Sequence, residues 1–177
     1  MSRQVVLYIT ASLDGFIADM EGGVGWLEGA EDEDYGFGEL MDSVDAVLQG
    51  SHTYLETMSL VDEDPYKGKT NYVFTSRDDL PELGSPQFVH EDPAEFVRRL
   101  KQQAGGRIWL IGGGELASLL VSAGLVDEID LFVQPVVLGD GIPLWRPPLR
   151  ERHLELVEAR PWPGGLAELR YRVPGQV

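Results

Sequence analysis

The 177-residue sequence predicts an α/β fold, in which a twisted mixed sheet of about eight strands is flanked by helices and finished by an antiparallel hairpin. Two observations support this prediction. Short apolar runs rich in β-branched residues alternate with segments whose apolar residues recur every three or four positions, which is typical of strand–helix units. Near the end, residues 153–159 and 166–173 are strand-like and are joined by the Pro- and Gly-rich residues 161–165, which predicts a hairpin. We expect a single domain over residues 1–177.

The composition excludes several kinds of site and partner. The chain has no cysteine, which excludes disulfides, thiolate metal ligands and a cysteine nucleophile. Its three histidines are widely separated, and we expect no bound metal. A formal net charge of −16 argues against nucleic acid and anionic membrane surfaces as partners. No apolar run reaches membrane-spanning length, and the first residues lack the apolar core of a signal peptide, so we expect a cytoplasmic protein.

The first predicted strand, residues 4–10, leads to a polar turn and a glycine-rich loop. Asp14 precedes Gly15 in an otherwise apolar segment, so its carboxylate is expected at the end of the strand, facing whatever lies there. Residues 22–25 contain three glycines and lead to Trp26 and Leu27. A glycine-rich loop that carries an aromatic residue is a candidate lid over a site, and a plain surface loop is equally compatible.

An acidic segment precedes the first predicted helix. Residues 37–44 place apolar side chains on one helical stripe, and the acidic residues of 28–34 stand before it, where negative charge is favourable. Capping the helix accounts for most of these carboxylates. One of them, such as Glu31 or Asp32, could in addition face the pocket.

The strand predicted at residues 44–50 ends in Gly50, and a helix follows with Ser51 as its expected cap. Such a strand–glycine–helix junction can hold an anion at the helix N-terminus, where Thr53 could add a hydrogen bond. The third strand, residues 71–75, is followed by Ser76 and Arg77, whose hydroxyl and guanidinium suit the 2′-phosphate of an NADP-type adenosine. A turn with a solvated arginine explains these last residues equally well.

A second junction of the same kind lies at residues 107–121. A buried strand ends at Ile111, three glycines follow at 112–114, and helical spacing resumes from Glu115 and Leu116. A bare turn rarely needs three glycines in a row, so a phosphate cradle is favoured over a tight connection without a ligand. The G-x-G-x-x-A match is weak, and its late position, with acidic residues opening the next strand, argues against a Rossmann topology.

The next strand is predicted at residues 128–137. Its apolar stretch 131–133, with Trp145 nearby, leads us to expect a homodimer.

Four motifs appear together and in order over nearly the whole chain: Ala11-Ser-Leu-Asp-Gly, Asp45-Ala-Val-Leu-Gln-Gly-Ser-His-Thr53, Leu110-Ile-Gly-Gly-Gly114, and Gly124-Leu-Val-Asp-Glu-Ile129 with Pro135-Val-Val-Leu-Gly139. On these residues the chain resembles the dihydrofolate reductase-like superfamily, in the branch of the reductase domain of the riboflavin-pathway deaminase-reductase, here in a stand-alone form. The resemblance implies a three-layer dihydrofolate reductase-like fold and an NAD(P)H-dependent oxidoreductase. Hydride would pass from NADPH, or from NADH, to a C=N or C=O of a small heterocycle of the pterin or riboflavin-pathway pyrimidine type. A module of the same fold that binds nucleotide or pterin without turnover is the alternative.

The resemblance also implies site residues, carried over position by position. The substrate side would comprise Trp26 and Leu27, with Asp14, Glu31 or Asp32 as the catalytic carboxylate. The chain departs from the family at Ser51, where dihydrofolate reductases usually have a base that contacts the 2′-phosphate, so the choice of NADPH over NADH depends on Arg77. The expected cofactor-binding residues are Ala11, Gly50, Ser51, Thr53, Thr75, Ser76, Arg77, Ile111, Gly112, Gly113, Gly114, Glu115 and Leu116.

Overall fold

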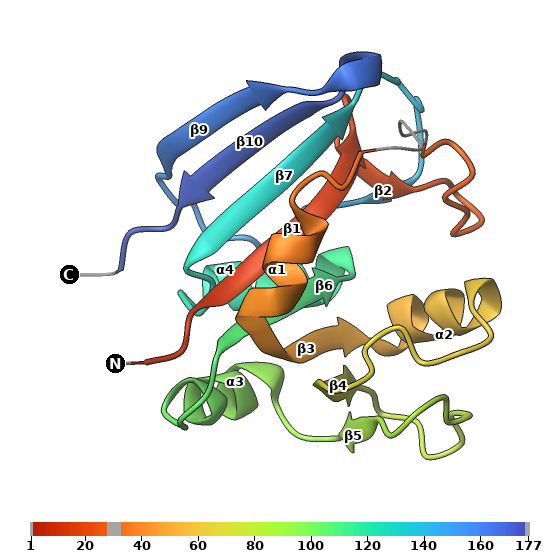
Figure 1. Cartoon of the computed structure of the whole chain (residues 1–177), viewed down its shortest axis with the longest axis vertical. Helices are drawn as coiled ribbons and strands as arrows, with labels where there is room; N and C mark the ends of the chain where they lie inside the picture. Colours follow the sequence, from red (N-terminus) through yellow and green to blue (C-terminus); the bar gives the residue numbers. More distant parts are fainter. Residues whose placement is uncertain (1, 28–32, 176–177) are drawn as a thin grey trace.

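The computed structural model describes residues 2–27 and 33–175, and its main feature is one eight-stranded sheet (Figure 1). The strands lie in the order β5-β4-β3-β6-β1-β7-β10-β9. Their bounds are β1 Val5–Ser12, β3 Val44–Gly50, β4 Thr70–Phe74, β5 Gln87–Val89, β6 Arg107–Gly112, β7 Glu128–Gln134, β9 Glu155–Pro161 and β10 Ala167–Arg172. A separate two-stranded sheet pairs β2 (Phe16–Ala18) with β8 (Ile142–Pro143). The helices are α1 Phe37–Ser43, α2 Ser51–Leu60, α3 Pro93–Lys101 and α4 Gly114–Ser122, with a 3-10 turn at Pro163–Gly165.

The pairing confirms the mixed sheet and its C-terminal hairpin. The six strands from β5 to β7 pair in parallel, whereas β10 runs antiparallel to β7 and β9 antiparallel to β10. The sequence predicted β7 to extend to residue 137, but the strand ends at Gln134. The reason is Pro135, which has no N–H to donate to a ladder. The small β2–β8 pair was not predicted, because two and three residues are too short to show a period.

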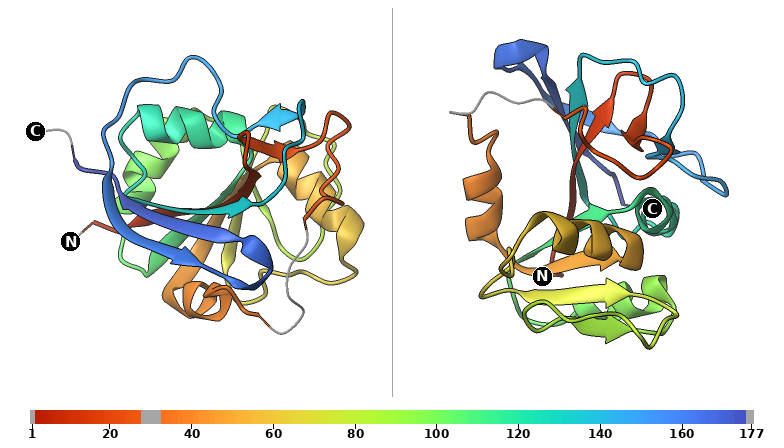
Figure 2. Two further views of the ribbon diagram at one scale, coloured as in Figure 1. Left: turned by 90° about the horizontal axis from the view of Figure 1, so that it is seen from above. Right: turned by 90° about the vertical axis from the view of Figure 1, so that its right-hand side faces the viewer.

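Helices pack on both faces of the sheet because successive strand residues point to opposite sides. Val5 and Leu7 of β1 belong to the large core cluster formed with α3 and α4. Val6, between them, packs with Leu40 of α1 on the other face, where Tyr54 of α2 covers β4. Figure 2 shows α1 and α4 on opposite sides of the sheet.

The face that carries α1 is only partly covered. The helix has seven residues and packs near β3, β6 and β1, so the neighbouring hairpin β9–β10 has no helix over it on this side (Figure 1). All seven residues of β9 are exposed. Charged residues therefore occupy this part of the sheet, and a cavity lies between them and α1.

Candidate cofactor and substrate site

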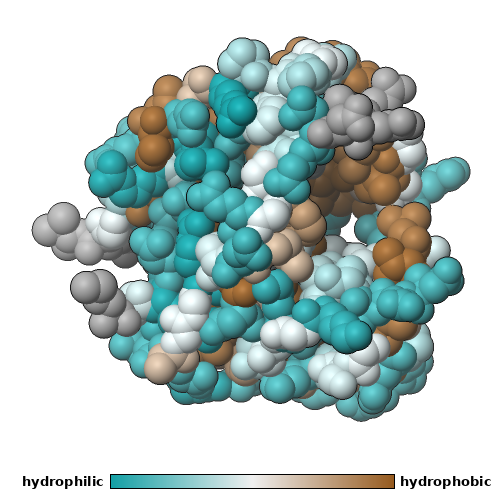
Figure 3. Space-filling view, in the orientation of Figure 1, coloured by the Kyte–Doolittle hydropathy of each residue, from teal (hydrophilic) through white to brown (hydrophobic). Residues whose placement is uncertain are grey.

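The two strand–glycine–helix junctions lie against each other. Because β3 and β6 are adjacent and parallel, their C-terminal ends reach the same edge of the sheet. A Cβ built on Gly50 would lie 3.9 Å from the backbone N of Gly113, and one built on Gly113 would lie 3.4 Å from Oγ1 of Thr53. Thr53 of α2 thus faces the junction that precedes α4. Figure 3 shows a hollow on this side of the molecule, with hydrophobic residues on its wall.

Neither helix that starts at this edge has a side-chain cap. The N-cap of α2 is Gly50 and that of α4 is Gly113, and neither start receives a side-chain hydrogen bond from the residues that the structure describes. The prediction that Ser51 caps α2 was therefore wrong: Ser51 is the first helical residue, and the extended backbone of Gly50 occupies the cap position. Two helices consequently direct uncapped N–H groups and their partial positive charges at one gap. This is the geometry that binds phosphate.

The three glycines of the second junction have different environments. Gly112 has φ 129°, which an L side chain rarely adopts. A Cβ on Gly114 would lie 2.4 Å from the carbonyl oxygen of Pro143 and 2.7 Å from that of Leu144, so close packing of another backbone segment accounts for this glycine. Among the glycines at this edge, Gly50 and Gly113 are therefore those whose missing side chain leaves space at the gap itself.

A small cavity of about 170 Å³ lies one strand away, on the face that carries α1. Tyr8 and Thr10 of β1 line it together with Phe132 and Gln134 of β7, because residues two apart share a face and Thr10 lies opposite Phe132. Leu27, predicted to bind substrate, also lines it, and Tyr35 and Leu166 complete the wall. The walls are mostly aromatic and aliphatic, and their polar groups are the hydroxyls of Tyr8, Thr10 and Tyr35 and the Gln134 amide.

The family of the chain is evident from its similarity to known proteins. Residues 3–167 match the family model of the RibD C-terminal domain. The chain belongs to the RibD C-terminal domain family. Among curated proteins it is similar to the uncharacterised protein YwjB of Bacillus subtilis (strain 168), with 41% identity over 157 residues, which cover 88% of this chain and 90% of YwjB.

Solved structures show that this RibD-family chain has a dihydrofolate reductase-like fold, as expected. A putative riboflavin biosynthesis protein from Shewanella sp. PV-4 superposes with a TM-score of 0.84 at 22% identity, covering 98% of this chain and 99% of that one. Dihydrofolate reductase from Enterococcus faecalis, complexed with NADP(H) and RAB-propyl, gives a TM-score of 0.71 at 15% identity, with 98% and 99% coverage. At these identities the likeness shows the fold alone.

The remaining predicted cofactor residues of the RibD-family chain are spread along the same edge. Thr75 and the exposed Ser76 and Arg77 follow β4, the strand next to β3. One edge of the Arg77 guanidinium is bound by Asp79: Nε donates to Oδ1 at 2.9 Å, and Nη2 donates to Oδ2 at 3.2 Å. The guanidinium lowers the pKa of the Asp79 carboxyl, so a phosphate at Arg77 would compete with this carboxylate.

The other predicted cofactor residues differ in how far their side chains are buried. Ala11 is buried and lies opposite Val133 of β7. Ile111 packs against the cluster around α1, and Leu116 is buried in the core under α4, whereas Glu115 is exposed. Leu116 therefore has only main-chain atoms to offer a cofactor, whereas the Ile111 side chain is half-buried.

Asp14 is bound in a turn. Its exposed carboxylate accepts hydrogen bonds from the Ser12 hydroxyl at 2.7 Å and from the backbone N–H groups of Leu138 and Gly139 at 3.1 and 2.7 Å. These donors lower the pKa of the Asp14 carboxyl, the Ser12 hydroxyl most of all. The geometry joins the end of β1 to the turn after β7, and it keeps Asp14 deprotonated.

The loop residues divide into described and undescribed ones. Trp26 is half-buried, and its indole N–H is buried without a hydrogen-bond partner in the described part of the chain. Glu31 and Asp32, the other predicted carboxylates, lie outside the described residues.

Sequence reasoning missed Tyr8, Thr10, Phe132 and Gln134, which line the small cavity. The period of two in β1 and β7 could have indicated which residues share a face, but not that these two strands are neighbours.

Residues 2–27 and 33–175 contain neither a membrane-spanning helix nor a cluster of metal ligands. No helix there is long and apolar enough to cross a lipid bilayer. Nor do three or more His, Asp or Glu side chains gather in these segments as ligands for a metal ion.

Proposed function

We propose that this protein is an NADPH-dependent reductase that transfers a hydride to a C=N or C=O carbon of a small, flat heterocycle. The observation that carries the proposal is the pair of uncapped helix N-termini, of α2 and α4, that meet across Gly50 and Gly113 beside a cavity of about 170 Å³. An enzyme of this kind needs phosphate-binding groups next to a small cavity for the ring that is reduced.

The residues at the gap fit a dinucleotide. A dinucleotide's phosphates carry negative charge, which the N–H groups of the first turns of α2 and α4 would bind, with the Thr53 hydroxyl as a further donor. The bound cofactor supplies the hydride. The chain would orient it: the phosphates would lie over the side-chain-free backbone of Gly50 and Gly113, and they would in turn fix the position of the ring near Ala11.

The cavity fits the substrate class. Aromatic and aliphatic walls from Tyr8, Phe132 and Leu27 suit the faces of a planar ring, and Thr10 and Gln134 are able to hydrogen-bond its polar edge. We assign Asp14 a positioning role, because its bonds to Leu138 and Gly139 hold the end of β1 and the following turn together. Glu31 and Asp32 are the carboxylates proposed to supply a proton to the reduced C=N.

One observation favours a second candidate, a binding module of the same fold without turnover. None of the described residues that line the cavity is an Asp, Glu or His. If neither Glu31 nor Asp32 reaches the ring, the protein would bind cofactor and ring compound without proton delivery.

The test measures binding and turnover separately. Calorimetry with NADPH and NADH reports binding, and loss of reduced-nicotinamide absorbance reports turnover with dihydrofolate, the riboflavin-pathway pyrimidine and simple aldehydes. The reductase proposal expects saturable binding, turnover with a member of this panel, and weaker substrate use by Thr10→Val but not by Thr70→Val. Binding without oxidation of any compound supports the module, and absence of saturable cofactor binding removes both candidates.

Substitution of Arg77 tests whether the protein prefers NADPH over NADH. Arg77→Ala is expected to weaken NADPH binding about fivefold to tenfold and NADH binding little, because only NADPH carries the 2′-phosphate. Asp79→Ala frees the guanidinium and should tighten NADPH binding. Equal effects of Arg77→Ala on the two cofactors in calorimetry would show that Arg77 does not contact the 2′-phosphate.

We also propose a homodimer, though not for the reason that the sequence suggested. The apolar stretch 131–133 belongs to β7, which lies between β1 and β10 and offers no edge to a partner. The exposed side chains of Leu156 and Val157 lie instead on the edge strand β9, where a second copy could cover them. Light scattering coupled to gel filtration would show a monomeric mass if this proposal is wrong.

A further inference from the structure

Tyr35, in the wall of the small cavity, has an unusual backbone conformation. Its φ is 53°, and among residues 2–27 and 33–175 it is the single non-glycine residue with a positive φ. A bulky side chain rarely adopts this left-handed conformation, because its Cβ crowds the following carbonyl oxygen. Glycine or asparagine would suit the backbone better at this position. The unfavourable backbone therefore suggests that the tyrosine ring itself has a task here.

The Tyr35 ring is held at a fixed angle in the cavity wall. Its centroid lies 5.1 Å from that of Trp162 at an interplanar angle of 66°, and 6.4 Å from that of Phe132 at 74°. Aromatic pairs favour such edge-to-face contacts. The residue is half-buried, and it lines the cavity of about 170 Å³ together with Tyr8 and Phe132. Two neighbouring rings thus fix the plane of a third ring that also borders the cavity.

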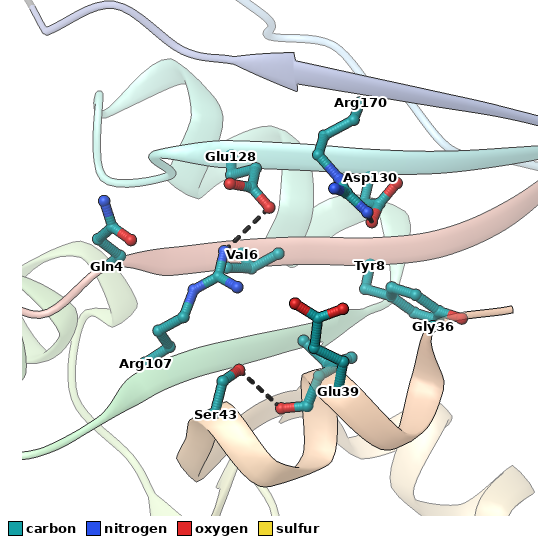
Figure 4. Close-up of a pocket in the computed structure, with 11 residues that line it drawn as sticks. Gln4, Val6, Tyr8, Gly36, Glu39, Ser43, Arg107, Glu128, Asp130 and Arg170 are labelled. Atoms are coloured by element: carbon teal, nitrogen blue, oxygen red, sulfur yellow. Dashed lines mark hydrogen bonds and ion pairs between the residues drawn. The ribbon is translucent and has the colours of Figure 1, made fainter. Parts of the chain in front are cut away.

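Tyr8 holds the backbone of Tyr35 in place. Its hydroxyl donates to the Tyr35 carbonyl oxygen at 3.1 Å. Figure 4 shows Tyr8 reaching from β1 towards Gly36, the N-cap of α1; the cavity in this view, of about 320 Å³, is a second one that Glu39 and Asp130 share. Burial raises the pKa of the Tyr8 phenol, and the Asp130 carboxylate adds to this, so the hydroxyl keeps its proton. That one proton is engaged with Tyr35, which gives Tyr8 a positioning role.

We propose that Tyr35 selects the substrate of the reductase: a flat aromatic heterocycle stacks on its ring, and Tyr8 positions that ring through the Tyr35 carbonyl group. The inference rests on the proposed function, because it concerns the cavity assigned there to the substrate. Stacking needs two flat faces, so a puckered, saturated ring loses this contact and is bound less well. Because the ring is already held by Trp162 and Phe132, the ligand does not have to order it.

The experiment titrates the full-length protein with lumazine, a flat bicyclic pyrimidine, in a calorimeter without NADPH. The ligand control is 5,6-dihydrouracil, which has the same pair of carbonyl groups on a smaller, puckered ring. We expect saturable binding of lumazine and about tenfold weaker binding of dihydrouracil. Absence of lumazine binding would overturn this inference, whereas absence of NADPH binding overturns the reductase and leaves the lumazine result standing.

Substitutions at position 35 separate the ring from the backbone. Tyr35→Ala should weaken lumazine binding about tenfold, and Tyr35→Phe should stay within about twofold of the parent because it keeps the ring. A ring that only packed against Trp162 and Phe132 would affect stability, measured as the urea midpoint, and leave the affinity of the folded protein unchanged. Parent-like affinity of Tyr35→Ala would therefore overturn the proposal.

The matched control is Phe37→Ala. Phe37 is an aromatic residue of the same segment; it contacts Tyr8 and Trp109 and does not line the small cavity. Its loss should change lumazine affinity less than about twofold. Equal weakening by Phe37→Ala and Tyr35→Ala would show that any disturbance near the start of α1 impairs binding, and the proposal would be abandoned.

A double-mutant cycle tests the role of Tyr8. Tyr8→Phe keeps the ring and removes the hydrogen bond to Tyr35, so it should weaken lumazine binding about fivefold in the parent. In Tyr35→Gly the same change should cost less than about twofold, because glycine adopts a positive φ freely and has no ring to position. An equal effect in both backgrounds would show that the Tyr8 hydroxyl contacts the ligand itself, and its action through Tyr35 would be refuted.

Discussion

Three helices of this protein begin in two different ways. The start of α3 is closed by its own sequence, because the Asp92 side chain accepts from the N–H of Glu95 at 2.9 Å and Pro93 has no N–H to satisfy. The starts of α2 and α4 have glycine in the cap position and no side-chain acceptor. The presence of a side-chain cap on α3 and its absence on α2 and α4 indicates where a ligand is expected. A helix start that serves only the fold receives a carboxylate, and two starts that face one gap are left without one.

We expect the glycines at the uncapped starts of α2 and α4 to have different roles, some in packing and some in binding the ligand. The prediction with the largest expected change in stability tests this. Gly114→Ala places a Cβ 2.4 Å from the carbonyl oxygen of Pro143, so it should lower the free energy of unfolding by about 3 kcal/mol. Urea denaturation followed by circular dichroism measures the change. A stability loss below about 1 kcal/mol would mean that the segment at residues 143–144 moves away easily and that Gly114 serves the ligand instead.

The second prediction closes an open helix start in the way α3 is closed. Gly50→Asp introduces a carboxylate at a cap position whose backbone is already extended and whose Cβ has ordinary contacts, at 3.9 Å or more. The side chain should accept from the first turn of α2 and keep stability within about 1 kcal/mol of the parent. NADPH binding should weaken at least a hundredfold, about 2.7 kcal/mol, because a negative charge replaces the space for phosphate.

Calorimetry measures the loss of affinity, and Gly50→Ala is the neutral control. The methyl group should weaken binding about tenfold, since it fills space without adding charge. If Gly50→Asp binds NADPH as tightly as the parent, the start of α2 does not hold a phosphate, and the difference between α2 and α3 has another cause.

The third prediction opens the closed helix start. Asp92→Ala removes the acceptor for the Glu95 N–H and should lower the free energy of unfolding by about 1 kcal/mol. NADPH affinity should stay within about twofold of the parent, because Asp92 follows β5, which lies two strands from β3 and its Gly50 junction. Calorimetry on this variant shows whether the effects at Gly50 belong to that junction or to any change in capping.

The smallest expected effect concerns Asp14, a second carboxylate occupied by backbone N–H groups. Asp14→Asn retains one acceptor oxygen, so kcat should fall less than about tenfold, well below the hundredfold to ten-thousandfold range of a lost proton donor. The pKa of Asp14 is lowered, so its contribution to stability is present above the unfolded pKa and is lost as pH falls through the folded one. The variant should therefore differ from the parent in stability at neutral pH and less so under acid conditions. A loss of kcat beyond about a hundredfold with unchanged stability would make Asp14 a proton donor.

Much of the fold could be predicted because it is encoded locally. Apolar runs that end in glycine before a helical stripe predict the junctions at Gly50 and at residues 112–114, and the structure contains both. The role of Ser51 could not be read this way. A serine before a helix is usually its cap, and only the backbone dihedral angles show that Gly50 holds that position and that Ser51 is already helical.

Taken alone, the sequence determined the α/β class, the order of the strands along the chain and the two glycine junctions, since each depends on residues within a few positions of one another. Only the tertiary structure decided that these junctions face each other across Gly50 and Gly113, that Thr10 stands beside Phe132, and that Glu39 and Asp130 share a cavity. The reason is strand order and register. They depend on how hydrophobic faces are buried over the whole sheet, and a local pattern fixes which side of a strand is apolar without fixing which strand lies next to it.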